Sequence, residues 1–420
     1  MRILFVSTVY PYPVDDGKKV ILGSMLDFFI EKFGSESIDY LLVDSGNSNK
    51  ICKDAKLKNI YSVMKPSATE QLKNVIWYSV IKREKSFQES FLFSKQIKKK
   101  IIQLKKENSY DLCIYDTIRM GQYLEGISTE KDILYMDDLF SVRYSEMLEV
   151  MKKHNNINFN PLGNFSALLP KWLLPLAHLK FINTLLLKLE KELVFKSEIK
   201  ISSFFSRVTL ISEKEMGLLK SLTSAKEINT VKPIVHFNEY NRNYSGKNKD
   251  FLFLGNLNIP HNDVSLREFI TLNIDKLIEK NIRIKIIGKN PNSDLKALVN
   301  MYPDNLVLMG YVKDLNYEFN TCCGMIIPLI FGSGVKIKTL EALGRGLPII
   351  STDFGVEGIP NMEKNSAIIE NDLASFHMHM ERLTDIRENN LFSLGSYKYF
   401  NKYFLKQAIY HEYERIFRLN

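Results

Sequence analysis

The feature that most constrains the fold of this chain is a repeated alternation of short, β-rich apolar segments with longer helical patterns. The apolar segments are residues 2–8, 38–44, 110–116, 132–138 and 207–212 in the first half, and residues 251–257, 283–289, 305–310, 324–330, 347–352 and 366–370 in the second. Strands that alternate with helices form parallel sheets covered by helices. The sequence therefore predicts an α/β protein with two Rossmann-like domains that face each other across a cleft.

A polar, Asn- and Lys-rich stretch at residues 238–250 has no hydrophobic periodicity and is interpreted as a linker. We therefore expect an N-terminal domain over residues 1–240, with a helical insertion at about 145–200. A C-terminal domain should follow over residues 250–395. The last segment, 396–420, has a helical pattern with an aromatic stripe and should return to the N-terminal domain.

The formal net charge of +9 suits polyanions, an anionic membrane face or phosphate-bearing substrates, and does not choose among them. Residues 168–193 are the nearest candidate for a membrane span, but two prolines and two lysines interrupt them. They are either a buried helix pair or, because Trp172 is flanked by lysines, a segment that lies on a bilayer. The four cysteines form no C-x-x-C pair, which favours a reducing, cytoplasmic setting.

A lysine-rich helix is predicted over residues 94–108, where lysines alternate with apolar residues. This pattern is typical of a solvated helix face, so it does not indicate nucleic-acid binding. The same face would also suit peripheral contact with an anionic bilayer.

The stretch "GSGVKIKTLEALGRG" follows the apolar segment 324–330 and carries the main chemical signal. Ligands of open α/β sheets bind at the carboxyl ends of strands, where helix N-termini present backbone N–H groups to anions. Gly332 and Gly334 would let a phosphate approach the backbone, and Lys336 and Lys338 would add positive charge. Glu341 would accept hydrogen bonds from a ribose diol. The alternative is that Lys338 and Glu341 are only a solvated i, i+3 pair.

A second glycine–acid–glycine turn, "FGVEGI", ends the next apolar segment and adds Glu357 and Gly358 to the candidate site. Two polar glycine turns after neighbouring strands are hard to explain by packing alone. Several other classes lack their motifs in this chain: there is no G-x-G-x-x-G fingerprint, no P-loop, no D-x-D and no H-E-x-x-H.

Five stretches of the sequence resemble successive parts of the family-4 (group 1) glycosyltransferases, which have the GT-B fold: 3–20, 204–215, 251–262, 284–298 and 305–359. The resemblance implies a retaining enzyme that needs no metal or other cofactor. It implies that a nucleotide-sugar binds the C-terminal half and that a glycan or lipid-linked acceptor binds the N-terminal half. It also implies a role in surface polysaccharide or glycoconjugate biosynthesis.

Residue roles in the donor half are carried over from the family's motif. Glu341 matches the second acid of the family's E-x7-E signature, which is expected on the donor ribose. The first acid would fall on Ser333, so the chain has a GSG-x-K-x-K variant of the motif. Asn256 stands in the loop where the family usually has a basic pair. We therefore hypothesise that Lys336 and Lys338 neutralise the donor diphosphate, with Lys338 acting in catalysis.

In the N-terminal half, Gly17 follows the turn "YPYPVDD" and would approach the donor phosphates or the acceptor, unless it only begins a helix. Asp16 in that turn is assigned to the acceptor side. Asp137 and Asp138 end the apolar segment 132–138 and would orient the acceptor hydroxyl, with Asp138 catalytic. The alternative is that these two acids only cap a helix.

Two other functions remain open. A nucleotide-sugar epimerase on the same fold would form product without any acceptor. A degenerate, non-catalytic subunit is also compatible with Ser333 and with the altered loop around Asn256. It would bind a partner or a glycan while binding nucleotide-sugar weakly or not at all.

Overall fold

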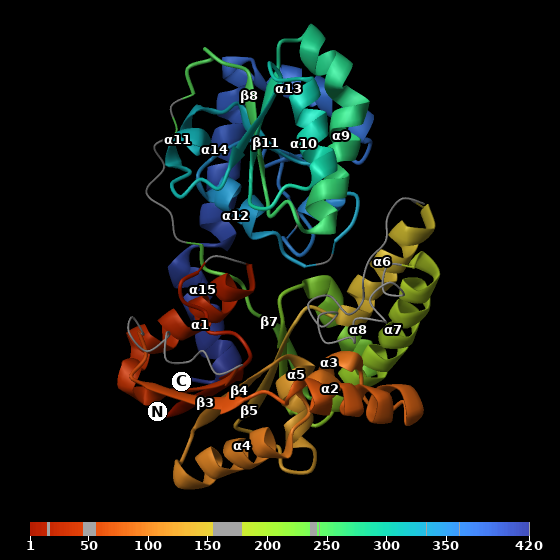
Figure 1. Ribbon diagram of the computed structural model, residues 1–420. Helices are drawn as coiled ribbons and strands as arrows, with labels where there is room; N and C mark the ends of the chain where they lie inside the picture. The colour runs from red at the N-terminus through yellow and green to blue at the C-terminus, as the bar shows by residue number, and fades with distance from the viewer. Residues whose placement is uncertain are drawn as a thin grey trace. The chain divides into compact units, whose positions relative to one another are not determined.

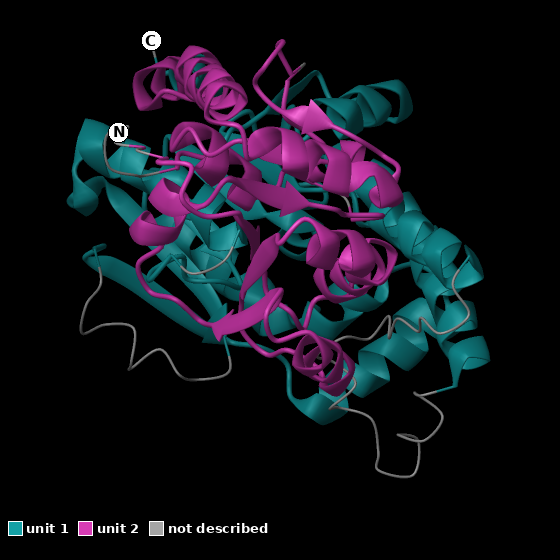
Figure 2. Cartoon of the chain, turned by 90° about the horizontal axis from the view of Figure 1, so that it is seen from above, with its two compact units in different colours: residues 1–232, 412–420 teal, residues 233–411 magenta. Residues whose placement is uncertain are grey.

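The computed structural model describes residues 1–14, 17–44, 56–153, 179–235, 242, 244–332, 334–360 and 362–419. The chain divides into two compact units (Figure 2): unit 1 contains residues 1–232 and 412–420, and unit 2 contains residues 233–411. This division lies a few residues before the predicted linker at 238–250.

Unit 1 contains a seven-stranded sheet, sheet A, in the order β3-β2-β1-β4-β5-β6-β7. All of its pairings are parallel. Its strands are β1 (Ile3–Ser7), β2 (Ile38–Asp44), β3 (Asn59–Met64), β4 (Leu112–Asp116), β5 (Asp132–Asp137), β6 (Arg207–Leu210) and β7 (Glu227–Thr230). The central strands are continuous apolar runs because helices cover both faces of the sheet (Figure 1).

The helices of unit 1 include the two that the sequence predicts most clearly: α1 (Gly17–Phe33) and the lysine-rich α4 (Lys95–Glu107). The lysine-rich helix turns Ile97, Ile101 and Leu104 inward, so most of its lysines form the outer face, whereas Lys105 pairs with the buried Asp132 at 2.7 Å. The other helical elements are α2 (Ala68–Asn74), the π-helical turn η3 (Val75–Ile81), α3 (Phe87–Leu92), α5 (Thr117–Gly121), α6 (Phe140–Lys153), α7 (Lys180–Ser202) and α8 (Glu213–Leu222).

Two buried glutamates of α7 hold neighbouring helices in place. Glu190 accepts hydrogen bonds from the backbone N–H groups of Phe87 (2.6 Å) and Gln88, at the start of α3. Glu198 accepts from the backbone N–H and the hydroxyl of Ser141, at the start of α6. Burial raises the pKa of both carboxyls to about 8.

The predicted insertion at 145–200 contains parts of α6 and α7, and residues 154–178 between them lie outside the described residues.

Unit 2 contains a six-stranded sheet, sheet B, in the order β10-β9-β8-β11-β12-β13, and its pairings are also parallel. Its strands are β8 (Asp250–Leu254), β9 (Arg283–Ile287), β10 (Leu306–Gly310), β11 (Gly324–Ile327), β12 (Ile349–Ser351) and β13 (Ile368–Ile369). Its helices are α9 (Pro260–Glu279), α10 (Ser293–Met301), α11 (Asn316–Thr321), α12 (Ile337–Gly344), α13 (Phe376–Leu383) and α14 (Ile386–Tyr403).

Successive residues of the strands in sheet B belong to two separate hydrophobic cores. Phe251 and Phe253 of β8 join the core on one face, whereas Leu252 joins the core on the other. Ile326 and Ile327 of β11 divide in the same way. This alternation follows from the two-residue period of a strand. It gives the unit the three-layer structure that the alternating sequence pattern predicts.

The last helix, α15 (Lys406–Phe417), carries the chain from unit 2 to unit 1. Its end packs on α1, where Phe28 meets Tyr413 edge-to-face at 5.3 Å. The Tyr413 hydroxyl donates to the carbonyl of Lys232, and Lys232 forms an ion pair with Glu412 at 2.7 Å. The predicted return of the C-terminal helix to the N-terminal domain is therefore confirmed for its last residues, from Glu412 on. The predicted segment 396–420 is not one helix, because α14 ends at Tyr403 and α15 begins at Lys406.

The sequence interpretation missed two strands, β3 and β7, which are the edges of sheet A. Both are only partly buried. An edge strand has a neighbour on one side only, so it needs no continuous apolar run. That is why neither segment stands out by composition.

The carboxyl ends of β8 and β9 approach each other closely at two glycines. A Cβ atom added to Gly288 would lie 1.8 Å from the carbonyl oxygen of Gly255. Gly288→Ala should therefore destabilise unit 2 by about 3 kcal/mol or more, because the obstacle is backbone. Denaturant unfolding measures this.

The matched control is Gly217→Ala inside α8, where an added Cβ meets nothing within 4 Å. It should leave stability unchanged or raise it by about 0.5–1 kcal/mol, because alanine favours helix. Equal unfolding midpoints for the two variants would contradict the close approach.

Candidate functional site

In sheet B the chain continues from β8 through β9 to β10 on one side, and from β11 through β12 to β13 on the other. The strand order therefore reverses between β8 and β11. Ligands of open α/β sheets bind at the carboxyl ends of strands at such a point. The loop that follows β11 contains Gly332 (φ +116°) and Gly334 (φ +81°), both in conformations that favour glycine. A Cβ on Gly332 would lie 3.2 Å from the ring of His261, at the start of α9. The loop after β11 therefore lies directly against the start of α9.

Lys336 has a different place from the one that the sequence suggests. Its ammonium is buried and donates to the carbonyls of Gly332 (2.8 Å) and Gly334 (2.5 Å). These bonds hold the glycine loop in its curved shape. Lys336 therefore stabilises the conformation of the loop. Its predicted contact with a diphosphate stays a prediction.

Lys338, in the first turn of α12, connects this helix with the start of α9. Its Nζ donates to Oδ1 of Asn262 at 2.9 Å, and Nδ2 of Asn262 donates to the carbonyl of Asn256 at 3.0 Å. Burial, together with the charge of Lys336, lowers the pKa of Lys338 to about 7. No salt bridge to Lys338 occurs among the described residues. Its ammonium lies over the ring of Phe253, 4.8 Å from the centroid, so a cation–π contact offsets its charge in part.

Asn256 itself is exposed, in the loop after β8. Its side-chain oxygen accepts from the backbone N–H of Asn258 at 3.2 Å. This is the local hydrogen bond typical of asparagine in a turn. In this structure the carboxamide of Asn256 therefore stabilises its own loop.

Glu341 lies one turn along α12 from Lys338, partly buried. Burial raises the pKa of its carboxyl, while Arg345 acts in the opposite direction. In the part of the chain that the structure describes, Glu341 forms no salt bridge with Lys338. Lys338 and Glu341 therefore do not form the simple i, i+3 ion pair that was the alternative interpretation. A partly buried carboxylate of this kind suits hydroxyl donors from a ligand.

The loop after β12 lies against the same helix. The Thr339 hydroxyl donates to the carbonyl of Gly355 at 2.7 Å, which ties α12 to this loop. Glu357 and Gly358 follow in the same loop, and Gly358 has φ +75°. The two glycine turns of the sequence are therefore neighbours in space, because each is bound to α12.

In sheet A the strand order reverses between β1 and β4, and a polar cluster lies at this point. The Ser7 hydroxyl donates to Asp116 at 2.6 Å, and the Lys18 ammonium lies 2.8 Å from the other oxygen of Asp116. Ser7 ends β1, Asp116 ends β4, and Lys18 lies in the first turn of α1. Only 2% of Asp116 is exposed, so this is a largely buried ion pair.

The next strand end adds the two acids that the sequence selects. Asp137 ends β5 with φ +69°, and Tyr135 donates to its carboxylate at 2.8 Å. Burial raises the pKa of Asp137, and Lys18 acts against this shift. Asp138 follows and forms an ion pair with Arg143. A left-handed conformation at a non-glycine residue costs free energy and often occurs at functional sites.

Within each unit, the described residues of the predicted site lie at or after the carboxyl ends of strands, with some differences. Gly17 is the exposed first residue of α1, whereas Asp16 and Ser333 lie outside the described residues. Sequence reasoning missed Ser7, Lys18 and Asp116. A polar residue at the end of an apolar strand was the available signal for Ser7 and Asp116.

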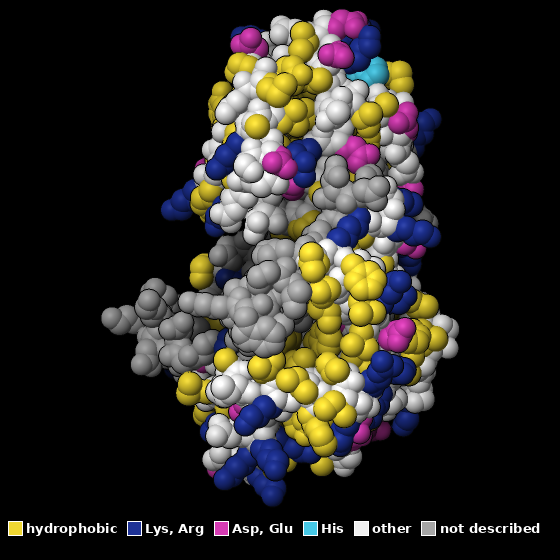
Figure 3. Space-filling model, turned by 45° about the vertical axis from the view of Figure 1, so that its right-hand side comes forward, with side chains coloured by type: hydrophobic (Ala, Val, Ile, Leu, Met, Phe, Trp, Pro, Cys, Tyr) yellow, Lys and Arg dark blue, Asp and Glu magenta, His cyan; other side chains and the backbone are white. Residues whose placement is uncertain are grey.

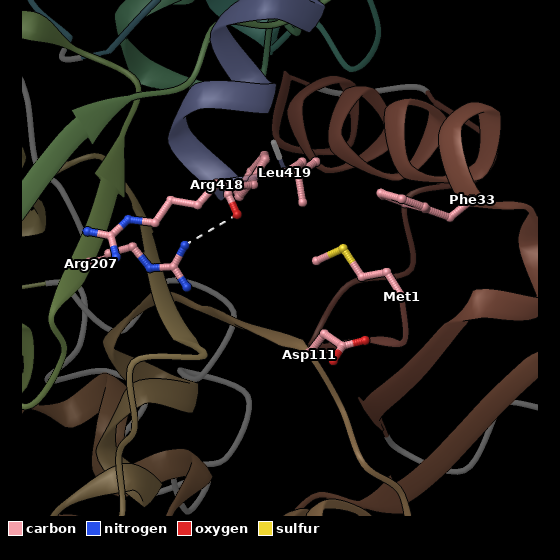
Figure 4. A pocket seen from close by; sticks show the side chains of 7 residues that line it. Met1, Phe33, Asp111, Arg207, Arg418 and Leu419 are labelled. Carbon is pink, nitrogen blue, oxygen red and sulfur yellow. Dashed lines mark hydrogen bonds between the residues drawn. The ribbon is translucent and has the colours of Figure 1, made fainter.

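A hollow of about 420 Å³ lies at the opposite, amino-terminal edge of sheet A (Figure 4). It is lined by Met1, Phe33, Asp111, Arg207, Phe417, Arg418 and Leu419. Its Arg207 donates to the carbonyl of Phe417 at 3.4 Å, which joins β6 to the end of α15. Because parallel sheets bind ligands at the carboxyl edge, we do not assign the active site to this hollow.

The described residues contain no group of three or more His, Cys, Asp or Glu side chains arranged to hold a metal ion. None of the described helices combines the length and the apolar character that a membrane crossing requires.

Residues 248–385 match the family model of glycosyl transferases group 1. A curated relative, an uncharacterized 44.6 kDa protein in the cps region of Klebsiella pneumoniae, is 28% identical over 189 residues. This alignment covers 43% of the chain and 47% of the relative, so the chain spans about half the length of the relative that it matches.

Solved structures resemble the whole chain. Sucrose-phosphate synthase from Thermosynechococcus elongatus has a TM-score of 0.66 at 12% identity, covering 100% of this chain and 98% of that one. HepE of Anabaena in complex with UDP has a TM-score of 0.64 at 11% identity, covering 100% of both chains. The fold is therefore GT-B. The family match over residues 248–385 supports a group 1 glycosyltransferase.

The position of Lys338 predicts a pH-dependent anion site. Sulfate keeps its charge between pH 6 and 8.5, whereas Lys338 loses its proton as the pH rises through about 7. Above that pH, binding must include the uptake of a proton. The sulfate affinity should therefore fall by up to about tenfold per pH unit.

Thermal-shift titrations with sulfate measure this dependence. Lys338→Gln should bind weakly at every pH, with a flat profile. The control Lys296→Gln, on an exposed position of α10, should behave as the wild type. A wild-type pH profile in Lys338→Gln would show that another group titrates.

Proposed function

We propose that the protein is a retaining glycosyltransferase of family 4 that transfers a sugar from a nucleotide-sugar to a glycan or lipid-linked acceptor. The observation that carries the proposal is the placement of Lys338 and Glu341 on one helix, α12, at the strand-order reversal of sheet B. This helix belongs to the segment that matches the group 1 family.

Unit 2 would bind the donor. The amino terminus of α12 directs backbone N–H groups toward the diphosphate, and no described side chain caps it. Lys338 supplies a positive charge, and Glu341 accepts hydrogen bonds from the ribose hydroxyls. Gly332, Gly334 and Gly358 leave room for the ligand beside the backbone. HepE, a protein of similar fold, has been solved with UDP and with UDP-glucose, which supports a nucleotide-sugar donor.

Unit 1 would bind the acceptor at the carboxyl edge of sheet A. Asp138 is held by Arg143, and Asp116 is held by Ser7 and Lys18. Carboxylates that are fixed in this way orient a hydroxyl group with little loss of entropy on binding. We assign the orientation of the acceptor hydroxyl to Asp138.

The chemistry would need few side chains. In a same-face transfer, the acceptor oxygen bonds to the anomeric carbon while the bond to the diphosphate breaks. The configuration is retained because the acceptor attacks the face from which the diphosphate departs, and the departing phosphate oxygen takes the acceptor proton. The protein then has to stabilise the charge that develops on the diphosphate, which Lys338 and the α12 terminus do. We propose that the GSG-x-K-x-K variant performs this without a metal ion or another cofactor.

The biological setting is part of the proposal. The Klebsiella relative is encoded in a cps region, which supports a role in surface polysaccharide biosynthesis. We propose that the protein works in the cytoplasm, with peripheral contact to the membrane that would carry a lipid-linked acceptor.

Glu341→Gln tests the donor site. Loss of hydrogen bonds to a charged acceptor costs about 1.5–3 kcal/mol, so donor affinity should fall about 10- to 100-fold. The measurement is thermal melting with UDP-, GDP-, ADP-, CMP- and dTDP-sugars and NAD. A donor at 100 times its dissociation constant adds about 2.7 kcal/mol of stability.

The control is Glu279→Gln, an exposed glutamate of α9 that pairs with Lys276. It should keep the wild-type shift with the same donor. If no nucleotide-sugar shifts the wild type, a degenerate binding subunit replaces the proposal. Product that forms without acceptor would identify an epimerase.

Asp138→Asn tests the acceptor side. The turnover number should fall about 100-fold or more, because a neutral amide orients the hydroxyl less well. The donor dissociation constant should not change, since the donor binds unit 2. Asp111→Asn, at the opposite edge of sheet A, is the control and should keep full turnover. An equal loss in donor affinity would place Asp138 outside the assigned role.

A further inference from the structure

The turn η3 presents an unusual set of side chains to solvent. Ile76, Trp77, Val80 and Ile81 are 47%, 51%, 49% and 60% exposed. The widened i→i+5 winding of this turn brings them to one side, which we call the η3 face. Single exposed apolar residues are common, but four large ones within six positions indicate a binding surface.

The η3 face is held rigidly from behind. Ser79, fully buried on the inner side, shares a hydrogen bond of 2.8 Å with Ser90 of α3. Val75 packs with residues of α3 and α7 in a small hydrophobic cluster: Phe87, Phe91, Leu186, Leu189 and Leu193. The apolar side chains of the η3 face are therefore exposed although the turn that carries them is folded and packed on its inner side.

Helix α7 adds further exposed apolar residues on the side of this cluster. Phe181 and Leu185 are 78% and 59% exposed. Figure 3, which brings this side forward, shows hydrophobic side chains interspersed with Lys and Arg over the lower part of the molecule. The surface is therefore a mixed apolar and basic one.

The charges around the η3 face are mainly positive. Lys73, Lys82 and Arg83 flank it in sequence, against Glu70 and Glu84, whereas the Lys85 ammonium turns inward and donates to Gln122 at 3.1 Å. The Lys82 ammonium lies over the ring of Trp77 at 5.4 Å from its centroid. Neighbouring Trp and Lys residues suit the headgroup region, where the ring is half immersed and the ammonium meets phosphate.

These features fit a lipid surface better than a protein. The apolar side chains project from a single helical turn, and a fluid bilayer accommodates such a shape without a matching cavity. The basic flanks and the net charge of +9 complement an anionic leaflet. We propose that the η3 face, with its basic flanks, docks on the surface of an anionic lipid bilayer. This docking requires no transfer activity, so it is tested separately from the proposed function.

The first experiment is co-sedimentation of the full chain with vesicles of phosphatidylcholine alone and of equal parts phosphatidylcholine and phosphatidylglycerol. The wild type should bind the mixed vesicles. Trp77→Ser with Ile81→Ser should lower the partition coefficient about tenfold or more. Lys82→Gln with Arg83→Gln should lower it about fivefold for each charge removed.

The matched control removes two exposed apolar residues elsewhere: Leu272→Ser with Ile278→Ser on α9, which are 50% and 49% exposed. This variant should bind as the wild type. Thermal melting of each variant separates loss of docking from loss of folding.

A second readout keeps the η3 face intact. The chain has two tryptophans, so Trp172→Phe leaves Trp77 as the single fluorophore. Its emission should be quenched by bromolipids in mixed vesicles. The proposal is overturned if Trp77 is not quenched, or if the Trp77→Ser, Ile81→Ser variant binds as the wild type. It is also overturned if that variant abolishes a concentration-dependent dimer, because a second copy would then be the occupant.

Discussion

The donor half of the proposed site depends on one hydrogen bond, from Nζ of Lys338 to Oδ1 of Asn262. It joins the start of α9, the helix after β8, to α12, the helix after β11, on the two sides of the strand-order reversal in sheet B. The bond uses only a neutral acceptor, so the charge of the ammonium is not compensated by it. Burial then lowers the pKa of Lys338 to about 7, and an anion bound beside it would favour the charged form. The same partly buried ammonium of Lys338 therefore holds α9 and α12 together and, in the proposed function, binds the anion.

Unlike Lys338 of unit 2, the buried carboxylates at the strand-order reversal of unit 1 have partners of opposite charge among the described residues. At its strand-order reversal, Asp116 is already paired with Lys18 and accepts from Ser7, and Asp138 is paired with Arg143. Buried carboxylates without such partners would take up protons. Thr117 and Asp137 both have left-handed backbone conformations, at +64° and +69°. Such conformations persist only where the surrounding packing requires them, so the ends of β4 and β5 are shaped at some cost in stability. That cost is consistent with a site that orients a ligand.

Much of the fold could be predicted from periodicity. The central strands and helices such as α1 and α4 lie close to the predicted segments, because a buried parallel strand must be apolar throughout. The edge strands β3 and β7 were missed because half-buried strands lack that pattern. In the candidate site, the turns at Gly332, Gly334 and Gly358 were predictable because glycines that follow an apolar run suit positive φ, whereas the role of Glu341 stays a prediction. Asp116 was not selected, because nothing in the local sequence places it beside Lys18, nearly a hundred positions earlier.

The sequence by itself determined the two parallel sheets, their helical cover and the positions of the glycine turns, since all three are written in local patterns of apolar residues and glycine. Only the tertiary structure decided what each lysine does. Lys336 and Lys338 are two positions apart in one motif and look equivalent in the sequence. Folding turns the ammonium of Lys336 back onto the carbonyls of its own loop and directs that of Lys338 toward Asn262 of another helix. The physical reason is that the partners and the pKa of an ammonium depend on the groups around it. The fold of the sheet brings these groups together from positions more than seventy residues apart in the chain.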